Sequence, residues 1–69
     1  MEDKIRQIID EVVKLAEIIA RETRETEGYI RRGDATTALR NTNDHRDEVQ
    51  DLVREYQKLT NEIQRLTRL

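Results

Sequence analysis

Residues typical of a helix core recur along this chain at alternating intervals of four and three, in both halves. The first half contains the series Ile5, Ile9, Val12, Ala16, Ile19, Thr23, Thr26 and Ile30. The second half contains Ala38, Thr42, His45, Val49, Leu52, Tyr56, Leu59, Ile63 and Leu66. A spacing that averages about 3.5 residues keeps one side of an α-helix against a partner helix over many turns. The spacing therefore predicts two long helices that pack lengthwise, as in a coiled coil.

A turn is predicted between the two series, at Gly33 and Asp34. Glycine adopts the left-handed conformation that ends many helices, and an aspartate can accept N–H bonds from the first turn of the next helix. We therefore expect an all-α antiparallel helical hairpin. Its expected parts are a single domain over 1–69, a helix over 2–32, the turn at 33–34 and a helix over 35–68.

Two features support a three-helix alternative with helices over 2–27, 34–41 and 44–69. Gly28 weakens the first helix, and the segment Asn41-Thr42-Asn43-Asp44 resembles a loop followed by a new helix start. The hairpin is favoured because the series keeps its phase across both places, where a true break would shift it.

In an antiparallel hairpin, series positions whose residue numbers add to 68 face each other, and polar residues then meet polar residues. Thr23 faces His45 and Thr26 faces Thr42 in this arrangement. The predicted buried polar network consists of Thr23, Thr26, Asn41, Thr42 and His45. No carboxylate of the series faces His45, and Glu48, one turn further on, is the one candidate metal-ligating neighbour. Carboxylate metal sites in helical bundles use more inward-facing glutamates, so we expect neither a metal nor another cofactor.

The first helix also carries apolar residues on both flanks of its series. Ile8, Leu15 and Tyr29 lie on one flank, and Val13 and Ala20 lie on the other. An apolar stripe this wide exceeds what one partner helix can cover. A chain of 69 residues without cysteine is also close to the lower size limit for a stable monomer. We therefore expect these five residues to form the interface of a homo-oligomer, with a four-helix dimer favoured over a six-helix trimer.

Composition excludes several other functions. The 13 basic and 15 acidic residues give a net charge of −2, which is unsuited to a dedicated binder of nucleic acid or anionic membranes. The chain has neither cysteine nor serine, and its threonines lack a dedicated base, so we expect no enzyme and no small-molecule ligand. Apolar runs are too short for a membrane span, and acidic residues at 2 and 3 do not fit a signal peptide. No localisation is indicated.

These features resemble two classes of helical hairpin. The length and the series are similar to those of Rop-like hairpins, which dimerise into four-helix bundles. The matched helices, the short Gly33-Asp34 turn, and a polar block separate from apolar layers resemble de novo designed hairpin homo-oligomers with buried hydrogen-bond networks. This second resemblance implies a self-assembling structural bundle whose polar network specifies the partner. Such designs often carry more Glu, Lys and Ala, so a natural Rop-like adaptor that binds a protein or RNA is the alternative.

Overall fold

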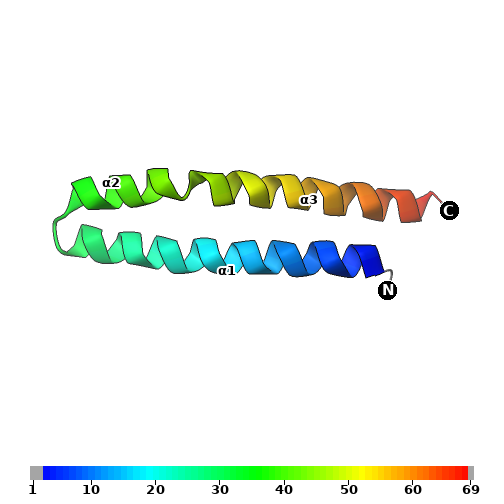
Figure 1. Cartoon of the computed structure of the whole chain (residues 1–69), viewed down its shortest axis with the longest axis horizontal. Helices are drawn as coiled ribbons and strands as arrows, with labels where there is room; N and C mark the ends of the chain where they lie inside the picture. The colour runs from blue at the N-terminus through cyan, green and yellow to red at the C-terminus, as the bar shows by residue number, and fades with distance from the viewer. Residues whose placement is uncertain (1–2, 69) are drawn as a thin grey trace.

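The computed structural model describes residues 3–68, and this part of the chain forms an all-helical hairpin. Its helices are α1 (Asp3–Arg31), α2 (Ala35–Asp44) and α3 (Arg46–Thr67). Helix α1 forms one arm, while α2 and α3 follow each other along the other arm, so that α1 starts near the end of α3 (Figure 1). The hairpin is 54 Å long, with widths of 16 and 14 Å. The prediction of an all-α chain with packed helices is confirmed.

The chain reverses at Gly33 and Asp34, where the sequence predicts a turn. Gly33 has a φ of 77°, a left-handed conformation that glycine adopts without a Cβ clash. The N–H groups of Gly33 and Asp34 bond to the carbonyls of Ile30 at 3.0 Å and Tyr29 at 2.9 Å, which is the Schellman pattern. The Asp34 carboxylate then accepts the Thr37 N–H at 3.1 Å. Hydrogen bonds from the Thr37 side chain and from the Thr37 N–H lower the pKa of Asp34.

The second arm differs from the predicted single helix over 35–68 because it is interrupted at His45. His45 has φ −108° and ψ 13°, which ends α2 and precedes α3. The preceding Asn, Thr and Asp residues favour side-chain bonds to the backbone over helix continuation. Thr42, for example, donates to the Leu39 carbonyl at 2.8 Å.

The other predicted helix bounds differ only slightly from those observed. Helix α1 continues through Gly28, so the break proposed there in the three-helix alternative is absent. Arg32 and Arg68 lie just beyond the helices, and residue 2 lies outside the described residues. The interruption at His45 leaves α2 and α3 in line along the same arm (Figure 1).

The core of the hairpin lies on a different side of α1 from the one predicted. The predicted series consists of two columns with a seven-residue repeat, 5-12-19-26 and 9-16-23-30. The hairpin instead buries the 8-15-22-29 column together with the 5-12-19-26 column. Ile8 is 8% exposed and Leu15 is 7% exposed, whereas Ile30 is 57% exposed. The reason is size, because Ile8, Leu15 and Tyr29 bury more apolar area than Ala16 and Thr23 would.

This rotation corrects the predicted oligomer interface. Ile8 and Leu15 pack inside the hairpin, so the prediction that they face a second chain is wrong. Tyr29 is half-buried, with its ring centroid 4.9 Å from the Arg32 guanidinium carbon. Val13 and Ala20 remain exposed, as an interface requires.

The open end of the hairpin is joined by an ion pair between its two arms. Lys4 Nζ lies 3.0 Å from Glu62 Oε1. Arg65 also donates to Glu62 Oε2, from Nε at 3.1 Å and from Nη2 at 2.6 Å. The Arg65 hydrogen bond, followed by that from Lys4, lowers the pKa of Glu62.

Candidate functional site

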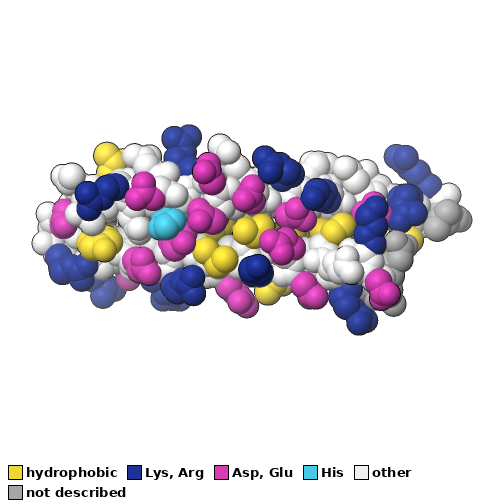
Figure 2. Space-filling model, in the orientation of Figure 1, with side chains coloured by type: hydrophobic (Ala, Val, Ile, Leu, Met, Phe, Trp, Pro, Cys, Tyr) yellow, Lys and Arg dark blue, Asp and Glu magenta, His cyan; other side chains and the backbone are white. Residues whose placement is uncertain are grey.

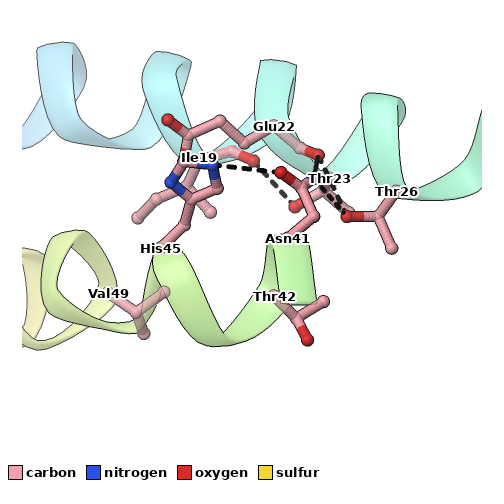
Figure 3. Close-up of a pocket in the computed structure, with 8 residues that line it drawn as sticks. All are labelled: Ile19, Glu22, Thr23, Thr26, Asn41, Thr42, His45 and Val49. Atoms are coloured by element: carbon pink, nitrogen blue, oxygen red, sulfur yellow. Dashed lines mark hydrogen bonds and ion pairs between the residues drawn. The ribbon is translucent and has the colours of Figure 1, made fainter. Parts of the chain in front are cut away.

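A polar cluster bridges α1 and α2 in the half of the hairpin nearer the turn, and Asn41 lies at its centre. The Asn41 amide nitrogen donates to the Glu22 backbone carbonyl at 3.1 Å and to Thr26 Oγ1 at 2.9 Å. The Thr26 hydroxyl also bonds to the Glu22 carbonyl, at 3.2 Å. Figure 3 shows these bonds between the two arms. They fix the relative positions of the helices at this level.

The same bonds determine which nitrogen of His45 carries a hydrogen. A backbone carbonyl only accepts, so the Asn41 atom that faces the Glu22 carbonyl must be the amide nitrogen. The other amide atom, Oδ1, therefore faces His45 Nε2, at 3.2 Å. Because this oxygen needs a donor, Nε2 carries the hydrogen. The neutral form of His45 then presents a lone pair at Nδ1.

Two carboxylates face this Nδ1 atom. Glu22 Oε2, from α1, lies 3.1 Å away, and Glu48 Oε2, from α3, lies 3.8 Å away. The side chains of Glu22, His45 and Glu48 are 15%, 30% and 32% exposed. The three facing atoms are themselves buried and, with His45 neutral, all three are acceptors, so none of them finds a hydrogen-bond donor. Three potential metal ligands with unsatisfied atoms therefore converge, and we call them the His45 cluster.

The predicted polar network is only partly present. Thr26, Asn41 and His45 are joined, whereas Thr23 and Thr42 bond within their own helices. Thr23 donates to the Ile19 carbonyl at 2.7 Å, and both threonines are exposed. In Figure 3 the Thr42 hydroxyl points away from the cluster. The prediction that Thr23 and Thr42 belong to a buried network is therefore wrong, because each hydroxyl finds a nearer acceptor in its own backbone.

Glu22 is the functional residue that sequence reasoning missed. No carboxylate of the predicted series faces His45, but Glu22, which lies outside the series, does so across the hairpin. A signal was available, because Glu22 occupies the same column as Ile8, Leu15 and Tyr29 at seven-residue spacing. An acidic residue in an otherwise apolar column indicates a specific partner.

A cavity of about 110 Å³ opens beside the cluster. It is lined by Ile19, Glu22, Thr23, Thr26, Asn41, Thr42, His45 and Val49. Glu22, Asn41 and His45 therefore line a space large enough to hold water, beside the buried Glu22 Oε2 and His45 Nδ1 atoms.

A second feature is an open apolar groove along the hairpin. It is lined by Val12, Ala16, Leu52, Val53, Tyr56, Gln57 and Thr60. Val53 and Tyr56, which line this groove, are exposed, and so are four large apolar side chains on the same heptad positions or on neighbouring ones. We call these six residues the apolar face: Val13, Ile30, Val49, Val53, Tyr56 and Ile63. Figure 2 shows apolar side chains along the middle of the molecule between charged ones, with the histidine among acidic residues.

No family model, curated protein or solved structure matches this chain. Within residues 3–68, no helix has the length and apolar character that crossing a membrane requires.

Proposed function

We propose that this protein is a self-assembling structural helical bundle, of the kind built in designed hairpin oligomers, and that two copies join through the apolar face. The observation that carries the proposal is the amount of apolar surface left uncovered by the hairpin. Val53 is 65% exposed and Tyr56 is 58% exposed, on an arm whose other side packs against α1. Large exposed apolar side chains that line one groove are typical of an interaction site.

The small core explains why a second copy is the expected partner. Within residues 3–68, only Ile5, Ile8, Leu15 and Ala38 are buried, and no large side chain is fully buried. A domain with so small a core usually needs oligomerisation to be stable. The bundle supplies the missing burial if each copy covers the apolar face of the other.

The shape of the apolar face supports self-association. The groove combines large side chains, such as Tyr56, with the small Ala16. In a two-fold arrangement, the ridge of one copy can fill the groove of the other, because both copies present the same surface. The seven-residue repeat of Val49, Tyr56 and Ile63 keeps this ridge on one side of α3.

The polar cluster favours one alignment of the two arms within each copy. Asn41 and Thr26 share a hydrogen bond between the two arms, so they require a fixed alignment of these arms. A register that separated them would leave polar groups without partners, at a cost of about 1–3 kcal/mol for each buried group. The cluster therefore favours one hairpin register over others.

The experiment compares light-scattering masses of the unmodified chain and two charge-adding variants. Val53→Glu places a charge in the apolar face, whereas Asn61→Glu adds the same charge at an exposed position outside it. We expect a mass of twice 8.2 kDa for the unmodified chain and for Asn61→Glu, and a lower mass for Val53→Glu. Equal masses for both variants would contradict the proposed interface. A helical monomer of the unmodified chain would favour a natural adaptor hairpin instead.

A further inference from the structure

We propose that Glu22, His45 and Glu48 form a binding site for a first-row transition-metal dication, with Zn²⁺ as the expected ion. The candidate ligand atoms, one from each residue, lie within 4.8 Å of one another. They come from α1, from the residue between α2 and α3, and from α3. The site therefore connects all three helices.

The distances are close to those of a tetrahedral site. Zn²⁺ binds imidazole nitrogen and carboxylate oxygen at about 2.0–2.1 Å, so neighbouring ligand atoms lie about 3.3 Å apart. The observed distances from His45 Nδ1 are 3.1 Å to Glu22 Oε2 and 3.8 Å to Glu48 Oε2. The two carboxylate oxygens lie within 4.8 Å of each other, so side-chain movements that shorten this distance bring the three atoms around one ion.

Asn41 holds His45 in the form that binds metal. Its Oδ1 accepts the Nε2 hydrogen at 3.2 Å, which leaves the Nδ1 lone pair directed at the two carboxylates. A metal-bound histidine usually donates its other N–H to an oxygen in this way, which fixes the ring and its tautomer. The Asn41 amide is itself held by Thr26 and the Glu22 carbonyl.

The two negative charges of Glu22 and Glu48 favour a bound cation in the cluster. Without one, a lone pair faces two carboxylate oxygens, and the three buried atoms have no hydrogen-bond partner. A dication would neutralise both carboxylates and satisfy all three atoms. A proton on Nδ1 is the competing occupant, but it supplies one positive charge where two negative charges converge.

The ligand types select the class of metal. Imidazole together with carboxylate suits zinc, copper and nickel, whereas calcium and magnesium prefer sites built from oxygen alone. Three protein ligands leave a fourth position, which the adjoining cavity of about 110 Å³ makes accessible to water. All three ligands come from one chain, so the site does not depend on the proposed self-assembly.

Calorimetric titration with ZnCl₂ tests the site. We expect one ion per chain, and binding weaker by more than about tenfold in Glu22→Gln and Glu48→Gln. Glu17→Gln, which removes an exposed carboxylate of the same helix outside the cluster, should bind as tightly as the unmodified chain. Circular dichroism checks that each variant stays helical. Equal affinity in Glu17→Gln and Glu22→Gln would overturn the proposal, as would equal competition by CaCl₂.

A measurement on the unmodified chain covers the case in which a variant unfolds. In ¹⁵N NMR of the His45 ring, ZnCl₂ should shift the Nδ1 resonance while Nε2 keeps its hydrogen. Binding through Nε2, or no change at saturating ZnCl₂, would show that a proton rather than a metal occupies the cluster.

Discussion

Glu22 and His45 meet across the hairpin, with 3.1 Å between the Glu22 Oε2 and His45 Nδ1 atoms. This contact ties α1 to the one interruption of the second arm, because His45 is the residue that separates α2 from α3. The same ring contacts Asn41 through Nε2, so the interruption lies within the polar cluster. Val49 belongs to the apolar face and also lines the cavity beside the polar cluster, so the two features adjoin.

Asn41 and Thr26 should be energetically coupled because they share a 2.9 Å hydrogen bond between the two arms. A double-mutant cycle with Asn41→Leu and Thr26→Val should give a coupling energy of about 1 kcal/mol, above the scatter of about 0.3–0.5 kcal/mol for independent sites. Urea unfolding measures it. The pair Thr23 and His45 is the control and should be additive, since the Thr23 hydroxyl bonds within its own helix. Coupling confined to the control pair would contradict this register.

Leu15 should be a core residue of the hairpin itself. Leu15→Ala should destabilise the fold by about 2–4 kcal/mol, because it removes a buried side chain that is 7% exposed. Leu39→Ala makes the same chemical change at a position that is 63% exposed, and should cost about 0.5 kcal/mol or less. Urea unfolding at one fixed protein concentration compares them. Equal losses would place Leu15 outside the core.

The two glycines should respond in opposite directions to alanine. Gly33→Ala should destabilise the hairpin by about 1–2 kcal/mol, because its φ of 77° suits glycine and strains alanine. Gly28→Ala should stabilise it by about 0.5–1 kcal/mol, since an added Cβ in this helix meets only the end of the Arg32 side chain, with Nη1 at 3.6 Å and Nη2 at 3.9 Å. Thermal unfolding distinguishes these effects. A loss of stability in Gly28→Ala would show that the close approach of another group requires this glycine.

Acid should weaken the open end of the hairpin through Glu62. Its pKa lies below the ordinary 4.5 because Arg65 and Lys4 stabilise the carboxylate. The resulting stabilisation is present above the unfolded pKa and is lost as pH falls through the lower, folded pKa. Glu62→Gln should therefore be less stable than the unmodified chain at pH 7, and this difference should shrink below about pH 4. Thermal unfolding across this range measures it, and a constant difference would exclude a role for the Glu62 charge.

The sequence predicts the hairpin well because its features are local. The spacing of apolar residues and the Gly33-Asp34 pair each determine structure within a few turns of helix. The side of α1 that faces the other arm was predicted wrongly, since the 8-15-22-29 and 9-16-23-30 columns are both compatible with a helical repeat. The choice between the two columns depends on how much apolar side-chain area each of them buries against the second arm.

The candidate site is harder to predict from sequence because it depends on which side of α1 faces the second arm. Asn41 and His45 lie on one arm, at i and i+4, and their proximity follows from helix geometry. Glu22 reaches them only because α1 is rotated so that the 8-15-22-29 column faces inward. With the 9-16-23-30 column facing inward instead, Glu22 would lie on a flank of α1, away from His45.

Sedimentation equilibrium of the unmodified chain at several concentrations tests self-assembly most directly. We predict a mass of twice 8.2 kDa at high concentration, with helical content lost as dilution dissociates the dimer. We expect this result because the apolar face of one copy is buried only when it packs against a second copy. A constant mass of 8.2 kDa with full helical content at every concentration would contradict the account.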